Sequence, residues 1–351
     1  MPKSAAEVVL PSPDLDASIA FFRDQLGFRL DMIFPADAPR VALLSGHGLT
    51  VRLDTAHTDA PATLCLRTDD AALLAAEQPL TAPGGVGVIT RPLAEESLDV
   101  TLEPTTHIEP PAEDGAWGVG RAGMQYRDLL PGRLGGAWMA SHIRIPNGGP
   151  VPDYVHHHHV RFQIIYCRRG WVRVVYEDQG EPFVMHEGDC VLQPPHIRHR
   201  VLECSDGFEV VEVGSPAEHQ TLVDHDMILP NDRIDPERLF SGQRFVRHVA
   251  ADTSWQASEY AGLEVRPTGI ATATDGIGDV RVLRPDGSAS VVEMAADNPF
   301  LLRFVLDGSL TLDLDGETRL GAGAAFVVPA DRAHRIGDFS DDCRILEVTG
   351  C

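Results

Sequence analysis

Two stretches of the chain repeat one arrangement of glycine, proline and histidine. "GDCVLQPPHIRH" (188–199) and "GAAFVVPADRAH" (323–334) each place a Pro six residues and a His eleven residues after a Gly. Each stretch follows two strand-like runs that flank a further glycine, "QIIYCRRGWVRVVY" around Gly170 and "LLRFVLDGSLTLDL" around Gly308. Such self-similarity predicts two homologous all-β units in the C-terminal part of the chain.

Length and composition agree with several domains that are rich in sheet. The 351 residues exceed one ordinary domain, and the 32 Gly and 26 Pro lie between short runs of Val, Ile and Leu. The net charge of −23 argues against a nucleic-acid or anionic-membrane partner, because Lys and Arg bind phosphate groups.

The sequence also predicts where the chain resides. The N-terminus has no long apolar stretch with a basic flank, and no run approaches the roughly 18–20 apolar residues of a membrane-spanning helix. The six cysteines show no paired C-x-x-C spacing. We therefore expect a cytoplasmic protein in a reducing compartment.

The first 110 residues mix strand and helix patterns. "EVVLPSPDLDASIAFFRDQLGFRLDMIF" indicates a strand, a turn, an amphipathic helix and a strand, with Asp14 or Asp16 as the helix cap and Gly27 at its end. "RVALLSGHGLTVRLD" predicts a hairpin that turns at 46–48, and "ATLCLRTDDAALLAAEQPL" begins a second strand–helix–strand pattern. This doubled pattern resembles the glyoxalase/bleomycin-resistance (vicinal oxygen chelate) family.

That resemblance implies a metal bound by a His or Glu on the first strand and a Glu on the closing strand of the half. Glu7 occupies the first position here, but Arg52 stands where the second carboxylate belongs, and a cation would repel a metal. His47, His57 and His107 lie near turns without partners at ligand spacing. We therefore expect a structural or substrate-shaping domain that binds no metal.

Four consecutive histidines precede the first β unit, in "PDYVHHHHVRFQIIYCRRGW" (152–171). The pattern H-x-H-x4-[E/Q]-x6-G, followed by G-x5-P-x4-H, resembles that of the cupin family, whose jelly-roll barrels bind one divalent metal inside the barrel. The family's spacing implies that the metal ligands are His156, His158, Gln163 and His199.

Strand geometry gives this spacing a physical reason. Residues i and i+2 share a face of a strand, so His156 and His158 can point into a barrel while His157 and His159 point away. Three imidazole nitrogens and an amide oxygen suit a borderline divalent ion. Two alternatives stay open: a register slip would make His157 and His159 the ligands, and Gln163 could be an ordinary hydrogen-bonding core residue.

The same count gives a different result in the second β unit. The ligand positions there hold Met294, Ala296 and Leu301, which leaves His334 alone. One imidazole cannot hold a metal against water, so a degenerate barrel kept for packing is expected.

These observations predict a mainly β chain with an α+β N-terminal domain. We expect a βαβββ glyoxalase-like domain at 1–110, followed by two cupin jelly-roll barrels. The metal-binding cupin domain would span 111–230 and the degenerate cupin domain 231–351.

The resemblance implies one divalent transition metal per chain, with Fe(II) favoured and Ni, Zn or Mn as alternatives. A Gln at position 163, where Glu is commoner, leaves the ion its full charge, which makes it a stronger Lewis acid. Three functions are compatible: an Fe(II) dioxygenase of a small chelating carbonyl or phenolic compound, which we favour; a Ni or Zn lyase, isomerase or cyclase of a keto or sugar acid; and a non-catalytic sensor.

Strand alternation suggests further pocket residues. In "WMASHIRIP", His142 and Arg144 share a face; on the inner face Arg144 could clamp a substrate carboxylate and His142 could transfer protons, whereas on the outer face both are ordinary surface groups. Tyr154 could line the mouth of the pocket, Gln193 could face inward, and His196 is expected at a surface turn. A small-molecule substrate is expected, and a homodimer is compatible with both families.

Overall fold

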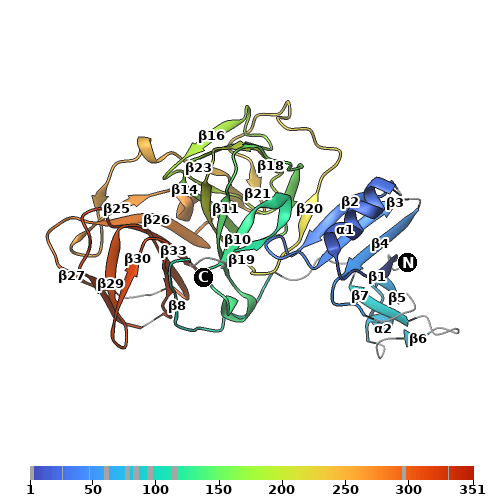
Figure 1. Ribbon diagram of the computed structural model, residues 1–351, viewed down its shortest axis with the longest axis horizontal. Helices are drawn as coiled ribbons and strands as arrows, with labels where there is room; N and C mark the ends of the chain where they lie inside the picture. The colour runs from blue at the N-terminus through green and yellow to red at the C-terminus, as the bar shows by residue number, and fades with distance from the viewer. Residues whose placement is uncertain are drawn as a thin grey trace.

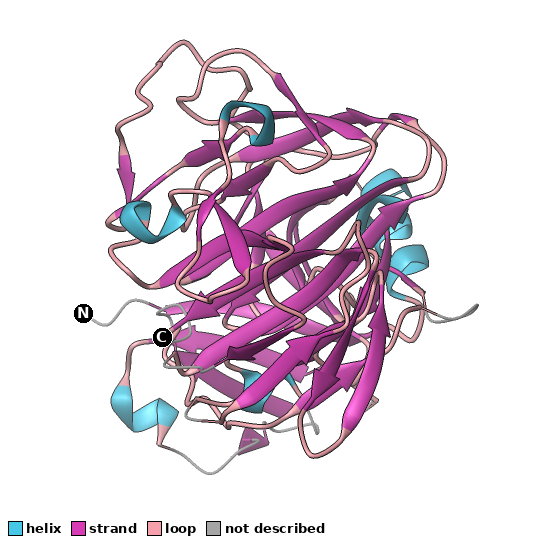
Figure 2. Ribbon diagram, turned by 90° about the vertical axis from the view of Figure 1, so that its left-hand side faces the viewer, coloured by secondary structure: helices cyan, strands magenta, loops and turns pink. Residues whose placement is uncertain are grey.

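A computed structural model describes residues 4–25, 27–46, 48–58, 63–75, 80–81, 87–92, 98–112, 117–294, 298–330 and 332–351. An N-terminal unit, a first barrel and a second barrel lie in a row in chain order (Figure 1). Strands dominate all three parts (Figure 2). Among the described helices, none is long and apolar enough to cross a bilayer.

The N-terminal unit is a sheet with one larger helical segment on it (Figure 1). Its elements are β1 (Ser4–Pro11), α1 (Leu15–Ala20), the π-helical η1 (Phe21–Gln25), β2 (Arg29–Phe34), β3 (Val41–Gly46), β4 (Leu49–Asp54), β5 (Thr63–Thr68), α2 (Ala71–Leu74), β6 (Leu80–Thr81) and β7 (Gly87–Pro92). The strand order is β2-β3-β4-β1-β5-β7-β6, with β1 parallel to β4. Residues 4–54 therefore have the βαβββ order that the resemblance implied, and Asp14 caps α1 through Ala17 N–H (2.9 Å).

The first barrel consists of two facing sheets. Its elements are β9 (Gly118–Val119), η2 (Arg121–Gly123), β10 (Gln125–Asp128), η3 (Arg133–Gly136), β11 (Met139–Ile145), β12 (Gly149–Pro150), β13 (His156–His158), β14 (Phe162–Arg169), β15 (Trp171–Tyr176), β16 (Phe183–His186), β17 (Cys190–Leu192), β18 (His199–Cys204), β19 (Phe208–Ser215) and β20 (Thr221–Val223). One sheet has the order β16-β15-β18-β13-β20, and the other β17-β14-β19-β11-β10-β9. Apolar residues from both sheets, such as Ile143, Val174 and Phe208, pack between them.

The second barrel repeats this arrangement. The remaining elements are β21 (Leu239–Phe240), β22 (Gln243–Arg244), β23 (Val246–His248), η4 (Ala250–Asp252), β24 (Gln256–Ala257), β25 (Leu263–Pro267), α3 (Ile270–Ala273), β26 (Gly278–Pro285), β27 (Val291–Met294), β28 (Phe300–Asp307), β29 (Ser309–Asp313), β30 (Glu317–Gly321), β31 (Ala325–Val327), β32 (His334–Gly337) and β33 (Arg344–Gly350). Its sheets are β24-β25-β26-β33-β28-β31 and β27-β32-β29-β30. The two barrels confirm the internal repeat predicted from the sequence.

Each barrel receives an edge strand from outside its own run of strands. β8 (His107–Glu109), which precedes the first barrel in the chain, pairs with β31 of the second barrel. β23, which follows the first barrel, pairs with β17 of that barrel. β17 and β31 are the equivalent strands of the two repeats, so each barrel receives its extra strand at the same position. Strands on one side of the predicted domain boundaries at 110 and 230 therefore pair with strands on the other side. The boundaries themselves stay predictions.

One apolar core joins the two barrels. Trp138 stacks on Phe300 of the second barrel with ring centroids 4.1 Å apart and an interplanar angle of 5°. A Cβ atom added at Gly350 would lie 2.2 Å from Trp138 Cζ2, so only glycine allows this approach. The barrels therefore share buried surface rather than only a linker.

This close contact gives a first prediction. Gly350→Ala should destabilise the protein by about 1–3 kcal/mol, because the buried indole of Trp138 cannot retreat without disturbing Phe300. Chemical denaturation measures the loss. Gly321→Ala is the matched control, since a Cβ atom there would meet nothing within 4 Å. Equal stability of the two variants would contradict the packing described.

The N-terminal unit extends a sheet of the first barrel. β20 pairs with β13 on one side and with β2 of the N-terminal unit on the other, through Met32 opposite Leu222 and Ile33 opposite Thr221. The sheet therefore runs from the first barrel into the N-terminal unit without interruption. This continuity places the N-terminal unit beside the histidine-bearing strand β13.

Candidate metal centre

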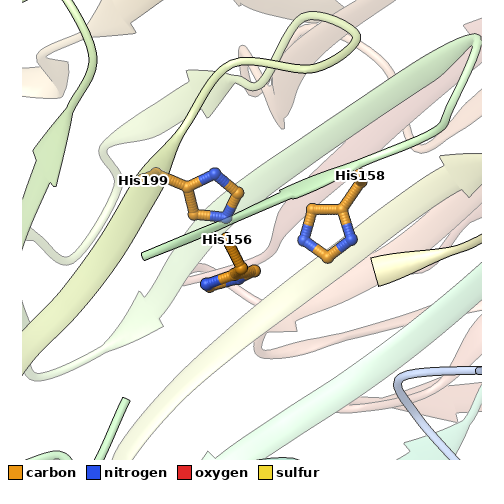
Figure 3. Close-up of side chains that lie close together, drawn as sticks. All are labelled: His156, His158 and His199. Carbon is orange, nitrogen blue, oxygen red and sulfur yellow. The ribbon is translucent and has the colours of Figure 1, made fainter. Parts of the chain in front are cut away.

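Three of the four predicted ligands lie together inside the first barrel. On the antiparallel strands β13 and β18, His156 stands directly opposite His199, and His158 follows two residues later on the same face. One ring nitrogen from each of the three lies within 4.8 Å of the other two, and all three side chains are buried. Figure 3 shows the three imidazoles around one small space. Among the described residues, this is the only such group of three or more His, Cys, Asp or Glu side chains.

The Nδ1 atoms of these histidines are already engaged. Those of His156 and His199 donate to the backbone carbonyls two residues earlier, at 2.8 and 3.0 Å. Nδ1 of His158 bonds to the hydroxyl of the buried Thr221 at 3.1 Å. Such contacts fix the ring orientation and leave Nε2 for another partner. Nε2 of His156 is buried without a hydrogen bond, so this nitrogen is available to bind a metal.

Burial also sets the protonation state of the triad. Loss of water keeps the pKa of His156 and His158 well below the ordinary histidine value, and it lowers the pKa of His199 to about 4. The imidazoles are therefore neutral near pH 7, which is the form that binds metals. Donor type, burial and protonation all fit a divalent transition metal.

The fourth predicted ligand, Gln163, has a buried partner that the sequence analysis missed. Its Nε2 donates to Glu212 Oε1 at 2.6 Å, while its Oε1 is buried without a hydrogen bond. Because Nε2 is the donor end of the amide, this contact leaves the amide oxygen as the end free for an ion. Burial raises the pKa of Glu212 to about 7. The available signal was the second of two Glu residues in the strand sequence "FEVVEVGS", since residues 209 and 212 point to opposite faces of a strand.

The support of His158 gives a second prediction. Thr221→Val should weaken metal affinity about 10–100-fold, because it removes the hydroxyl that orients the ring at nearly constant volume. Competition with a chromophoric chelator measures the affinity. Thr221→Ser keeps the hydroxyl and should bind like the wild type. A Val variant with unchanged affinity would show that the contact does not position the ligand.

The histidines open onto a small cavity that we call the metal cavity. It has a volume of about 80 Å³ and is lined by His158, His199, Glu212, Arg121 and Gln193, with apolar side chains from both sheets around them. Those apolar residues include Met124, Ile143, Ile145, Val172, Met185 and Phe208. Gln193 faces inward, as expected, and donates to the hydroxyl of Tyr176 at 2.8 Å.

The predicted catalytic residues are not in the metal cavity. His142 and Arg144 lie on the face of β11 opposite Ile143, which lines the cavity. His142 bonds to Glu209 at 2.8 Å, and the guanidinium of Arg144 lies 4.1 Å from the ring centroid of Trp117. The register of β11 thus turns both residues away from the cavity, although His142 is buried against Phe304 of the second barrel and is not an ordinary surface group.

Tyr154 lies beside the site rather than in it. Its ring is edge-on to His156, with centroids 5.8 Å apart. It lines a second hollow of about 630 Å³ between the N-terminal unit and the first barrel, which we call the outer cleft. It does not line the metal cavity, and its place at the mouth of that cavity stays a prediction.

The other two histidines of the run lie away from the triad. Nδ1 of His157 is 3.3 Å from Nδ1 of His196, and the ring of His159 stacks on that of His196 with centroids 5.1 Å apart. His196 adopts the left-handed turn conformation (φ 64°) and is only partly exposed, so the expected surface turn is packed against this pair. The register is therefore the one in which His156 and His158 face inward.

The second barrel has a guanidinium at the equivalent place. Met294 stands opposite His334 as His156 stands opposite His199, which matches the predicted alignment, while Ala296 lies outside the described residues. His334 is not alone, since Arg303 Nη1 donates to its Nε2 at 2.5 Å. Leu301 is buried at the fourth ligand position.

A fully buried carboxylate completes this cluster. Arg303 also contacts Glu347 at 2.6 Å, and both side chains are completely buried. Arg303 and Glu347 form the strand pair that corresponds to Ile165 and Glu212 in the first barrel. The guanidinium of Arg303 thus contacts His334 in the second barrel, at the position where the first barrel has a histidine triad suited to a metal.

The N-terminal residues considered for a metal have other partners. Glu7 is buried on β1 and pairs with Arg67 at 3.8 Å. Arg52 lies 3.4 Å from Asp54 on β4, and His107 lies 3.3 Å from a carboxylate oxygen of Glu109. His57 follows β4 in a loop, and His47 lies outside the described residues.

Comparison with known proteins agrees with this description. Residues 141–213 match the family model described as the Cupin domain, so this part of the first barrel is a cupin domain. No curated protein sequence matches the chain.

Solved structures with a similar fold include a Pseudomonas aeruginosa protein named as glyoxylate-induced (11% identity, TM-score 0.50, covering 79% of this chain and 97% of that one). Others are the salicylate 1,2-dioxygenase of Pseudoaminobacter salicylatoxidans (16%, 0.47, 71% and 83%) and the oxalate decarboxylase of Bacillus subtilis (14%, 0.46, 78% and 87%). Identities this low concern the fold alone.

Proposed function

We propose that the first barrel is a mononuclear metal-dependent enzyme, a dioxygenase that acts on a small chelating carbonyl or phenolic compound. The observation that carries the proposal is the triad of neutral, buried imidazoles, two of which, His158 and His199, line a small and largely apolar cavity. His156, His158 and His199 would hold the ion, with Gln163 Oε1 as a fourth donor. A bound divalent ion supplies Lewis acidity toward a chelating oxygen substrate.

The cavity walls favour one substrate class over another. A sugar acid carries several hydroxyl groups, and each would lose its bonds to water against side chains such as Ile143, Val172 and Phe208. A diketone or phenol has an apolar body and a polar chelating end, which match the apolar walls and the histidine end. The volume of about 80 Å³ suits only a small molecule.

One observation supports a second candidate, a Ni or Zn Lewis-acid lyase, isomerase or cyclase. All four donors at the centre are neutral, because the glutamine brings no charge. The ion would keep its full charge, which favours polarisation of a carbonyl over a change of oxidation state.

The N-terminal unit has a place in the proposed function. Its βαβββ order supports a glyoxalase/bleomycin-resistance type of domain, and its residue Ala36 lines the metal cavity. We propose that it shapes the substrate space and binds no catalytic metal of its own.

Metal replacement tests the proposal. The metal-free protein is loaded with Fe(II) or Zn(II), and oxygen uptake and product formation are measured with acetylacetone, catechol and 2-oxobutanoate. Oxygen uptake restored by Fe(II) but not Zn(II) supports the dioxygenase. Turnover with Zn(II) and no oxygen uptake would replace it with the Lewis-acid enzyme. Tight metal binding without turnover of any probe would favour a non-catalytic binding protein.

A further inference from the structure

Arg121 is a buried cation between two hollows. It is among the residues that line the metal cavity together with His158, His199 and Glu212, and it also lines the outer cleft. Its side chain is only 9% exposed. A charged side chain that is this buried needs partners, because removal from water is costly.

The partners of Arg121 are incomplete. Its Nη1 pairs with Asp153, a fully buried carboxylate that also accepts a hydrogen bond from Val201 N–H at 2.9 Å. Its Nε is buried and has no hydrogen-bond partner. A guanidinium presents five N–H groups in a planar fork that fits a carboxylate. The structure therefore holds a donor with unused bonding capacity at the wall of the metal cavity.

Arg121 is held by a tight turn between the N-terminal unit and the barrel. Gly120 N–H donates to Met124 O at 2.9 Å, which closes the turn. A Cβ atom at Gly120 would lie 2.6 Å from the ring of Tyr126 and 3.2 Å from Asp37 O, so the turn is wedged between them. Asp37 in turn pairs with Arg133 of the barrel at 2.6 Å. The backbone that carries Arg121 is thus held between the barrel and the N-terminal unit.

The charges in the metal cavity favour an anion. The charge of Arg121 is offset by Asp153, which it contacts, and Glu212, which lines the same cavity, carries at most one negative charge. A divalent ion would leave an excess of positive charge in an apolar space, where an opposite charge on the ligand interacts strongly.

We propose that Arg121 binds the carboxylate of a small chelating carboxylic acid with an apolar body, such as a 2-oxo acid, and so selects anionic over neutral substrates. The inference rests on the proposed function, because it places the chelating end of that substrate at the histidines. Arg121 takes the role predicted from the sequence for Arg144, from η2 rather than from β11.

Two probes of nearly the same shape test the charge preference. 2-Oxobutanoate carries a carboxylate oxygen where 2,3-pentanedione carries a methyl group. Their dissociation constants are measured by calorimetry on Zn(II)-loaded full-length protein, and the ratio of the two is the readout. The variant is the double substitution Arg121→Met with Asp153→Asn, which removes the buried pair without leaving a lone charge and without changing the net charge.

Wild-type protein should bind 2-oxobutanoate at least about tenfold more tightly than the diketone, and the double variant should lose about tenfold of this ratio. Arg121→Lys should keep part of it. Arg23→Met, at the exposed outer part of the cleft, should leave the ratio unchanged. Metal content of every variant is measured first, and the probes are titrated only into protein that carries the wild-type content, because Asp153 lies 3.7 Å from Nδ1 of the ligand His156.

An unchanged ratio in the double variant overturns the role of Arg121, and so does a wild-type protein that binds neither probe or prefers neither. These outcomes leave the metal centre standing. The proposed function fails by a different observation, a wild-type protein that retains no metal before any probe is added.

Discussion

His199→Ala should abolish stable metal binding, with elemental analysis falling from about one ion per chain to a trace. Loss of an imidazole leaves two histidines and an amide for the ion, and even a residue that only supports a ligand changes affinity about 10–100-fold. We expect a decrease beyond that range, because His199 is itself a donor of the triad. His156→Ala should have the same effect.

His157→Ala is the matched control for this prediction. It removes a neighbouring imidazole of the same run that bonds to His196 on the other side of β13. Its metal content should equal that of the wild type. If His157→Ala lost the ion and His199→Ala kept it, the register of β13 and the proposed centre would both be wrong.

Arg303→Met should destabilise the second barrel by about 3–5 kcal/mol. Removal of one partner from a buried pair leaves the other charge uncompensated in an apolar interior. Here Glu347, which is completely buried, would lose one of its two guanidinium partners. Arg281, which contacts the same carboxylate at 2.6 Å, would limit the loss toward the lower figure. Chemical denaturation followed by a probe in the second barrel measures the change.

Two further variants are the controls for this measurement. Arg335→Ala removes a largely exposed pair with Asp313 and should cost less than about 1 kcal/mol. Arg303→Met combined with Glu347→Leu removes both charges and should regain most of the stability. A loss below about 1 kcal/mol in the single variant would mean that the guanidinium does not hold this barrel together.

Together these results would separate the roles of the two barrels. In the first barrel the interior places neutral imidazoles around a space that fits an external cation. In the second barrel the chain supplies its own cation, since Arg303 donates to His334 through the nitrogen that its counterpart His199 leaves available. The barrels thus differ in the cation beside the histidines: the first is suited to a bound metal ion, and the second contains the buried side chain of Arg303.

The sequence by itself determined the repeat, the βαβββ order of residues 4–54 and the three histidines of the centre. These features depend on spacing along single strands and on turns. Alternate residues of a strand share a face whatever surrounds it, so the histidine run offered two candidate pairs, 156 with 158 and 157 with 159. The spacing implied by the cupin resemblance favoured the first pair and added His199 from the second motif.

Only the tertiary structure decided which residues accompany the histidines. Glu212, Arg121 and Arg303 reach their partners across strands or loops that are distant in sequence. The outward orientation of His142 and Arg144 depends on which face of β11 the barrel encloses, and alternation alone gives two equal solutions. Barrel closure and the exchange of β8 and β23 determine which face of each strand points inward, because they bury one face and not the other.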